Sequence, residues 1–243
     1  MLQTNDIVFE DDSVVCLNKP AGILSIPDRY NPNLPNAQTF LQKLYGQIFT
    51  VHRLDKETSG ILCFAKTEAA HRHLSLQFNQ HSVTKIYHCL LQGSLLTPEG
   101  TIDLPIGENP LRAGTMRIDR QHGKPSVTHY KVIERFRHYT YAEAQILTGR
   151  MHQIRVHFKA LGFPLMVDAI YGKQQKFLLS SIKPKYHLQK NAENELPLLQ
   201  RVPLHAHTLI LTHPETAAPI HLSADLPKDL RATLNQLRKH DTL

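Results

Sequence analysis

Short apolar runs separated by turn-forming residues dominate the chain, and they predict strands. The runs at 7–9 and 14–17 flank a polar segment at 10–13, so we expect a hairpin there. The continuous apolar run at 60–65 is typical of a buried strand. Further runs, several of them rich in β-branched and aromatic residues, predict strands at 85–92, 126–134, 139–147 and 205–212.

Other segments place apolar residues at helical spacing. Thr67 is suited to cap a helix that runs to about residue 80, and Pro227 to open a last helix. The clearest helical pattern lies at 149–162, where Gly162 and Pro164 end the helix. Strands outnumber helices, and short turns join several of them. We therefore predict an α+β fold with a largely antiparallel mixed sheet and flanking helices.

Two long stretches without periodicity, 109–124 and 173–200, are predicted to be surface insertions. Both are basic: the first contains Arg112, Arg117, Arg120 and Lys124, and the second contains Lys173, Lys176, Lys183, Lys185 and Lys190. Either both stretches are solvated loops or their cations bind phosphate groups.

Composition narrows the choice of partner. The 243 residues include 28 Lys and Arg against 21 Asp and Glu, a formal net charge of +7. A pI near 9.3 favours a polyanionic partner, with nucleic acid first. No apolar run approaches the roughly 20 residues of a membrane span, and the start lacks the pattern of a secretory signal. The three cysteines lie far apart in apolar stretches, so we expect free thiols and a reducing, cytoplasmic location.

The first candidate for chemistry is the segment 52–60, just before the buried strand. Asp55 lies between Arg53 and Lys56, and these cations favour the ionised carboxylate that a base or nucleophile needs. The alternative is a capped loop with no catalytic role.

The second candidate is Arg155, beside the apolar stripe of the clearest helix. His152 and Lys159 are its neighbours along the helix. An arginine in this place can reach a carboxylate or phosphate across a cleft. The alternative is a surface arginine whose stem covers apolar residues.

Taken together, these segments resemble the RluA family of pseudouridine synthases. The catalytic motif of that family is similar to His52-Arg53-Leu54-Asp55 followed by Thr58-Ser59-Gly60. Five further blocks follow the family's order: Asn18 to Gly22 (first motif), Lys85-Ile86-Tyr87 (active-site tyrosine), Pro105-Ile106-Gly107 with Gly123-Lys124-Pro125 (borders of an RNA-probing loop), Gly149 to His157 (arginine-bearing motif), and Leu204-His205-Ala206 with His213-Pro214 (C-terminal strand). The resemblance covers about 6–226.

The sequence departs from the family pattern at Met151, which follows Gly149-Arg150, and at Val167, which precedes Asp168. Only 54 residues precede Asp55, so no S4 RNA-binding domain is expected. We expect a single pseudouridine synthase catalytic domain over residues 1–243.

The resemblance implies an isomerase that converts specific uridines of structured RNA into pseudouridine, with no cofactor and no metal. It implies Asp55 as the essential carboxylate, Tyr87 as a residue that stacks on the uracil, and Arg155 as the partner of Asp55. Contacts with RNA are expected from Lys19, His52, Arg53, Arg112, Arg117, Arg120, Lys124, Arg150 and His152. Large-subunit ribosomal RNA is the favoured substrate and transfer RNA the second, and we expect a monomer without membrane association.

Other functions fit the sequence less well. A metal hydrolase could use His71 with His73, or His205 with His207, but the first pair lies on a predicted helix, where such spacing does not converge. An aspartyl phosphotransferase would need a different run after Asp55. A catalytically silent RNA-binding module of the same fold would not need Asp55, Tyr87 and Arg155 together.

Overall fold

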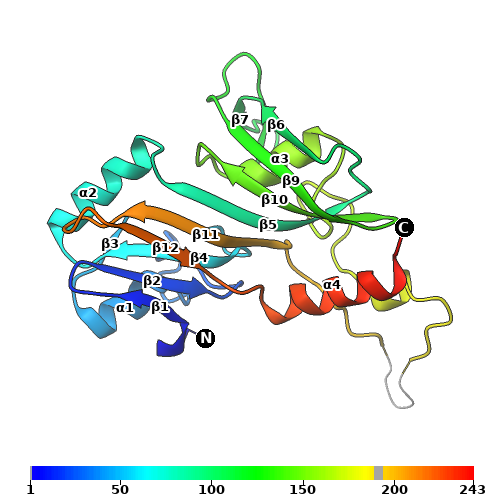
Figure 1. The fold of residues 1–243 in the computed structure, drawn as a ribbon, viewed down its shortest axis with the longest axis horizontal. Coiled ribbons are helices and arrows are strands. Elements are labelled where there is room, and N and C mark those ends of the chain that lie inside the picture. The colour runs from blue at the N-terminus through cyan, green and yellow to red at the C-terminus, as the bar shows by residue number, and fades with distance from the viewer. Residues whose placement is uncertain (1, 189–193) are drawn as a thin grey trace. The chain divides into compact units, whose positions relative to one another are not determined.

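The computed structural model describes residues 2–188 and 194–243, which form two compact units. The first unit comprises Met1–Tyr87 and His205–Asp225, and the second comprises His88–Leu204 and Leu226–Leu243 (Figure 1). Within the described residues no helix has the length and apolar character needed to cross a membrane.

The first unit is a sheet with two α-helices. Its strands follow the order β1-β2-β4-β11, with β12 on β11 and β3 on β4. The β4–β11 pair is parallel, and the other pairs are antiparallel. The elements are η1 (Thr4–Asp6), β1 (Ile7–Glu10), β2 (Val14–Lys19), α1 (Ala37–Tyr45), β3 (Phe49–Thr50), β4 (Ser59–Ala65), α2 (Glu68–Asn79), β11 (Leu204–Thr212) and β12 (Pro219–Ser223).

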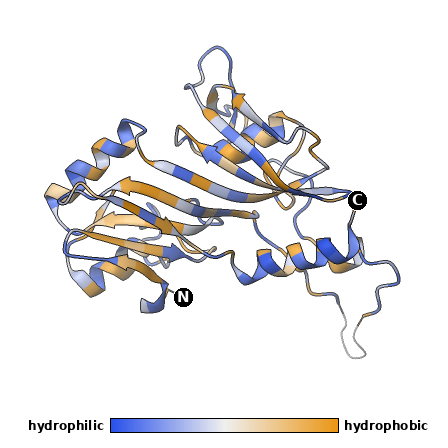
Figure 2. Cartoon of the chain, in the orientation of Figure 1, coloured by the Kyte–Doolittle hydropathy of each residue, from blue (hydrophilic) through white to orange (hydrophobic). Residues whose placement is uncertain are grey.

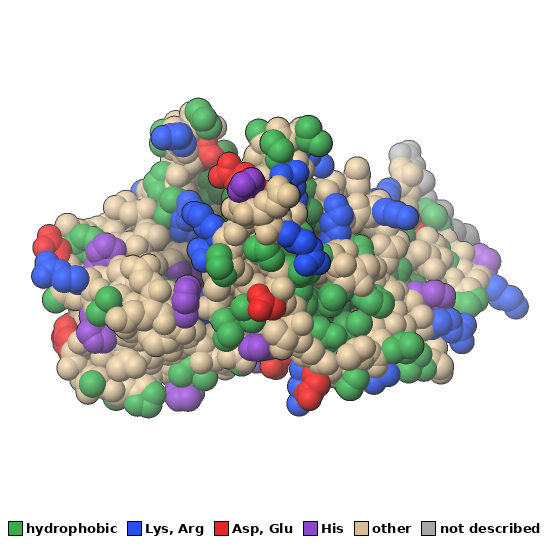
Figure 3. Space-filling model, turned by 90° about the horizontal axis from the view of Figure 1, so that it is seen from above, with side chains coloured by type: hydrophobic (Ala, Val, Ile, Leu, Met, Phe, Trp, Pro, Cys, Tyr) green, Lys and Arg blue, Asp and Glu red, His purple; other side chains and the backbone are tan. Residues whose placement is uncertain are grey.

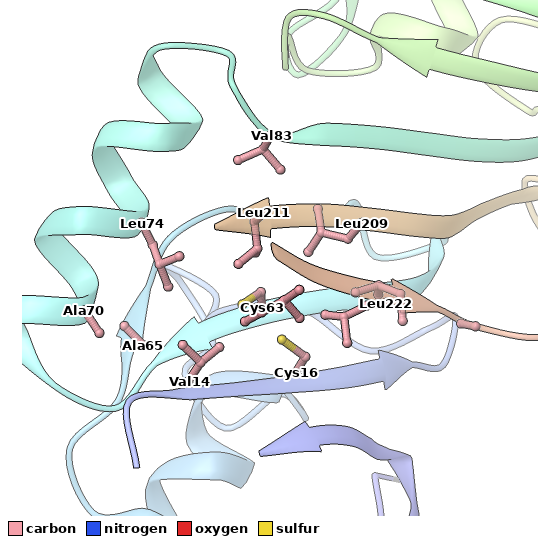
Figure 4. Close-up of a cluster of buried hydrophobic side chains, with 13 residues drawn as sticks. Val14, Cys16, Cys63, Ala65, Ala70, Leu74, Val83, Leu209, Leu211 and Leu222 are labelled. Carbon is pink, nitrogen blue, oxygen red and sulfur yellow. The ribbon is translucent and has the colours of Figure 1, made fainter. Parts of the chain in front are cut away.

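The strands that the sequence predicted from apolar runs form the core of the first unit. Strands β2 and β4 are predominantly hydrophobic, and every residue of β4 is buried (Figure 2). Figure 4 shows Leu74 of α2 facing side chains of β2, β4, β11 and β12, with the thiols of Cys16 and Cys63 among them. All three cysteines of the chain are free and buried.

The second unit contains the antiparallel ladder β10-β9-β6, a separate β7–β8 hairpin and two helices. Strand β5 (Thr84–Gln92) begins in the first unit and continues into the second, where it neighbours β10. The other elements are β6 (Glu99–Asp103), β7 (Ile106–Glu108), β8 (Met116–Ile118), β9 (Val127–Arg135), β10 (Tyr139–Ile146), α3 (Gln153–Ala160), η2 (Leu179–Ser181) and α4 (Lys228–His240).

The predicted α+β class and mostly antiparallel mixed sheet are confirmed, and each strand predicted above is present within a residue or two. The helix predicted at 149–162 is shorter, because His152 adopts a left-handed conformation (φ 55°) and α3 begins only at Gln153. Helix α1 was not predicted, although Asn36 caps it by accepting a hydrogen bond from the Thr39 amide at 2.8 Å.

The two predicted insertions are more ordered than expected. Residues 116–118 of the first stretch form β8, which pairs with β7, and the residues before them connect the two strands of this hairpin. In the second stretch, Phe177 and Leu199 pair with each other and are buried in a core cluster with α4. Only its remainder is surface, and Lys190 lies outside the described residues.

Candidate functional site

Asp55 lies in the segment that joins β3 to β4, and hydrogen bonds on both sides fix its backbone. The hydroxyl of Ser25 accepts from the amide of Leu54 at 2.9 Å and donates to the carbonyl of Leu54 at 2.7 Å. The amide of Thr58 donates to the carbonyl of Asp55 at 3.0 Å, which closes a tight turn. The half-buried Asp55 side chain therefore extends from a backbone with little freedom to move.

The buried side chain of Lys19 supports the turn at Asp55 through the carbonyl of the next residue, Lys56. Its ammonium donates to the carbonyls of Pro20 at 3.0 Å, Ile23 at 2.8 Å and Lys56 at 3.3 Å, while the amide of Gly22 also donates to the Lys56 carbonyl. The side chain has 0% exposure. Three carbonyl acceptors compensate a buried cation. This corrects the prediction that Lys19 contacts RNA: its ammonium is committed to the backbone beside Asp55.

The start of β4 is held against β11 by Gly60 and a buried histidine. Gly60 has φ 112°, and a Cβ atom there would lie 2.2 Å from the carbonyl oxygen of Ala206, so only glycine fits. The hydroxyl of Ser59 lies 3.0 Å from Nδ1 of His205, whose Nε2 lies 3.0 Å from the carbonyl oxygen of Ala224. The motif after Asp55 therefore anchors the loop to the sheet.

Tyr87 lies close to Asp55 in the first unit and is only 9% exposed. Burial and the nearby negative charge of Asp55 raise the pKa of Tyr87 far above its usual range. The phenol therefore stays protonated and neutral at physiological pH. A neutral aromatic ring with a hydroxyl beside a carboxylate suits the stacking role that the sequence predicted for Tyr87.

His52 has a structural role within the motif. Its Nε2 accepts a hydrogen bond from the amide of Cys63 at 3.0 Å, and its ring stacks on Phe78 at 4.6 Å between centroids. Burial, together with the nearby charge of Lys85, lowers the pKa of His52 to about 3. His52 is therefore neutral, and its predicted contact with RNA stays a prediction that would use the ring without a positive charge. Arg53, next to it, is exposed as an RNA contact requires.

Arg155 is buried on α3 and pairs with Asp168, a partner that the sequence did not indicate. Its Nε and Nη2 donate to the two carboxylate oxygens at 2.7 and 2.8 Å. The backbone amides of Ile170 and Tyr171 also donate to Asp168. Arg155 and these hydrogen bonds hold the pKa of Asp168 below its usual range, against the opposing effect of burial. The predicted pairing of Arg155 with Asp55 joins residues of different units and stays a prediction.

Gln153 holds the turn that leads into α3. Its Oε1 accepts from the Thr148 hydroxyl at 2.8 Å and the Arg150 amide at 3.0 Å, while Nε2 donates to the carbonyl of Val127 and the hydroxyl of Thr128. The half-buried side chain of Arg150 donates through Nε to the carbonyl of Pro125 at 3.3 Å. The predicted phosphate contact of Arg150 would use its remaining guanidinium nitrogens.

The β7–β8 hairpin and the residues that follow it carry the exposed cations of the second unit. They are Arg112, Arg117, Arg120 and Lys124, and all four side chains are exposed. Lys and Arg side chains are prominent on the face drawn in Figure 3. One contact within the hairpin region is the pair Arg117–Asp119 at 3.2 Å, which is exposed to solvent. The predicted contacts of these cations with phosphate groups stay a prediction, for which their exposure leaves them accessible.

The histidines of the hydrolase alternative do not converge. On α2, His71 stacks on Phe49, and Nδ1 of His73 bonds to Gln77 at 3.0 Å. Both ring nitrogens of His205 are hydrogen-bonded within the first unit. Across the described part of the chain, no three His, Cys, Asp or Glu side chains are grouped so that they could hold a metal ion.

Sequence reasoning missed Ser25, Asp168 and Tyr171 as residues that position the site. Ser25 lies 29 residues before its partner Leu54, and Asp168 lies 13 residues after Arg155. The two residues of each pair do not lie on one helix face or in paired strands. The periodicity of the sequence therefore could not predict that they make contact. The only signal was the carboxylate of Asp168 shortly after the arginine-bearing helix.

Known proteins share both the sequence and the fold. The family model described as RNA pseudouridylate synthase matches residues 13–160. Ribosomal large subunit pseudouridine synthase D of Neisseria meningitidis serogroup B is 36% identical over 238 residues, which cover 96% of this chain and 61% of that protein. The chain therefore spans about three-fifths of the length of that relative.

Three further similarities cover more of the other protein. The uncharacterized RNA pseudouridine synthase YlyB of Bacillus subtilis is 36% identical over 97% of this chain and 73% of its own length. The structure of human RNA pseudouridylate synthase domain containing 4 matches with a TM-score of 0.74 and 26% identity over 97% of this chain and 94% of the human chain. The dual-specificity RNA pseudouridine synthase RluA of Vibrio vulnificus is 34% identical over 87% of this chain and 79% of its own length. With these matches and the ordered motifs around Asp55, the chain belongs to the RluA family of RNA pseudouridine synthases.

Proposed function

We propose that this protein isomerises specific uridines to pseudouridine in structured RNA, and that its substrate is large-subunit ribosomal RNA. The observation that carries the proposal is Asp55 on a turn fixed by Ser25 and Lys19, with the neutral phenol of Tyr87 nearby. The name of the Neisseria relative, a ribosomal large subunit pseudouridine synthase, supports a ribosomal substrate, and transfer RNA is the alternative that we propose after it.

The reaction breaks the bond between N1 of uracil and C1′ of ribose and forms a bond between C5 and C1′. A proton leaves C5 and N1 gains one, so there is no net redox change and we propose no cofactor and no metal. Asp55 is the proposed essential carboxylate, whether it attacks the base, attacks the sugar or removes a ribose proton, because each role requires the ionised form. Tyr87 stacks on the uracil, and Arg155 is the proposed third catalytic residue.

A uridine stacked in RNA must leave the stack before these groups can act on it, at a cost of a few kcal/mol. We propose that Arg53 and the cations of the β7–β8 hairpin supply contacts with the RNA backbone that offset this cost. Arg150 and His152 are proposed to add contacts beside α3. Residues 1–243 act as one catalytic domain and as a monomer, in the cytoplasm, where the three cysteines stay reduced.

The experiment compares RNA substrates directly. The purified protein is incubated with full-length large-subunit ribosomal RNA and, separately, with a pool of transfer RNA, and pseudouridines are mapped at single-nucleotide resolution. We expect new pseudouridines at one or a few positions of the ribosomal RNA, and none with a mock purification. Product only in transfer RNA would establish the alternative substrate, and RNA binding without any product would establish a catalytically silent binding module.

A further inference from the structure

Tyr171 occupies a position in the second unit where three parts of the structure meet. It lies in the segment after α3, is only 7% exposed, and its amide donates to Oδ1 of Asp168 at 2.9 Å. Its ring lies under the guanidinium of Arg155, with 4.9 Å between the guanidinium carbon and the ring centroid. Tyr171 therefore contacts both Arg155 and the carboxylate that holds Arg155.

The hydroxyl of Tyr171 reaches the hairpin. It accepts a hydrogen bond from the amide of Met116, the first residue of β8, at 2.7 Å, and lies 2.7 Å from Nδ1 of His152. The hydroxyl accepts from Met116, and its hydrogen bond with His152 forms whichever of the two side chains supplies the proton. One oxygen thus joins β8 to the residue immediately before α3.

Apolar contacts follow the same route. Tyr171 is buried in one cluster with Ile106 of β7 and Val156 of α3, and Met116 and Ile118 of β8 pack against that cluster. Strand β8 also packs directly against α3. A displacement of the hairpin would therefore press on the residues that surround Arg155, since packed interiors transmit strain.

We propose that Tyr171 is a positioning residue that couples the β7–β8 hairpin to Arg155. The proposal rests on the proposed function, in which Arg155 acts in catalysis and the hairpin binds RNA. RNA bound to the hairpin holds β8, the Met116–Tyr171 hydrogen bond holds the Tyr171 ring, and the ring with Asp168 holds the guanidinium. The hairpin thus contributes to the rate of isomerisation at saturating RNA as well as to affinity.

The first test needs no activity. Tyr171→Phe removes one oxygen and keeps the ring, and Tyr141→Phe is a matched control because Tyr141 is also 7% exposed and its hydroxyl lies 2.6 Å from Nδ1 of His88. Loss of one hydrogen bond is expected to accelerate hydrogen exchange of the Met116 amide by about tenfold in Tyr171→Phe. The control should leave this exchange unchanged. Unchanged exchange in Tyr171→Phe would overturn the link between Tyr171 and the hairpin.

The second test measures the coupling. Single-turnover rates at saturating RNA are compared for the wild type, Tyr171→Phe, the hairpin variant R112Q/R117Q/R120Q, and the two combined. We expect each change to slow the reaction by about tenfold and the combination to be no slower than either alone, because both break the same chain of contacts. Losses that multiply, or an equal loss in Tyr141→Phe, would overturn the coupling. An inactive wild type would refute the proposed function, while the exchange of Met116 would still decide the link.

Discussion

Lys19, which supports the Asp55 turn in the first unit, and the cations of the β7–β8 hairpin region in the second unit were all assigned to RNA from the sequence, yet they lie in opposite environments. Lys19 is fully buried and donates to three carbonyls beside Asp55. Arg112 and Arg120 of the hairpin region are exposed. A positive charge thus holds the Asp55 turn from inside the protein in one place and is exposed to solvent in the other.

The comparison shows that a family motif mixes residues that act on the substrate with residues that hold them. Around Asp55, the holding groups include Ser25, whose hydroxyl bonds to the backbone of Leu54, and His52, whose Nε2 accepts from the Cys63 amide. Their replacement should change stability. In the hairpin region the charged groups face solvent. A surface ion pair such as Arg117–Asp119 contributes little to the stability of the fold. Replacement of these charged groups should change RNA affinity.

The largest effect is expected at Asp55 itself. Asp55→Asn keeps the size of the side chain and removes its charge, so pseudouridine formation should fall below about 1% of the wild-type rate, a loss of more than about 3 kcal/mol of transition-state stabilisation. RNA affinity and the free energy of unfolding should change little. Single-turnover assays, filter binding and urea unfolding measure the three quantities.

Asp28→Asn is the matched control, because Asp28 is half-buried like Asp55, lies in the same unit, and keeps its role as acceptor for the amides of Tyr30 and Asn31 after the change. Activity of Asp55→Asn near that of the control would remove Asp55 from the reaction.

The next effect is a loss of stability at Lys19. Lys19→Met removes the donor that three carbonyls share, although the Lys56 carbonyl keeps another donor, the Gly22 amide, so the free energy of unfolding should fall by about 2–4 kcal/mol. The salt dependence of RNA binding should stay the same, because no phosphate contact is lost. Lys43→Met, at an exposed lysine of α1, should change neither quantity. A flatter salt dependence with unchanged stability in Lys19→Met would return Lys19 to the RNA interface.

The hairpin should show the reverse pattern. In R112Q/R117Q/R120Q, the slope of log affinity against log salt should flatten by about 2–3 if all three cations meet phosphates. The free energy of unfolding should stay within about 0.5 kcal/mol of the wild-type value, as expected for surface substitutions. A charge-matched control, K131Q/R137Q/K239Q, changes three exposed cations elsewhere in the second unit. Equal slopes in the two triple variants would show that the hairpin has no special part in binding.

The smallest expected effect is a pH dependence of stability from His52. Its pKa is about 3 in the folded protein, against a usual value of 6.5, so between these values the unfolded chain binds more protons. The free energy of unfolding should therefore fall as the pH drops below about 6.5, by at most about 1.4 kcal/mol per pH unit from this residue. Above that pH the residue is neutral in both states and adds no slope.

His52→Gln keeps an acceptor for the Cys63 amide and cannot be protonated, so its stability should fall by about 1–2 kcal/mol less than that of the wild type between pH 7 and 5. Urea unfolding at both pH values gives the comparison. His122→Gln, at an exposed histidine, should follow the wild type. Parallel losses in all three proteins would mean that His52 is not held neutral by the fold.

Local patterns in the sequence determined much of the architecture. The apolar run ending at Ala65 marked β4, the polar turn at 10–13 marked the β1–β2 hairpin, and Thr67 marked the start of α2, whose Ala70 amide its side chain caps. These elements could be predicted because strand alternation, turn formation and helix capping depend on residues only a few positions apart. The motif around Asp55 could be recognised for the same reason, because its residues lie next to one another in the sequence.

The tertiary structure alone decided which members of the motifs face inward. Lys19 meets the carbonyl of Lys56 across 37 positions of sequence, and Ser59 meets His205 across 146. The pairing of Arg155 with Asp168 likewise depends on how the chain returns after α3. The sequence shows that a side chain is charged. Whether that side chain is buried, and which group it contacts, depends on segments that only folding brings together. A lysine in the sequence becomes an internal support or an RNA contact through that packing.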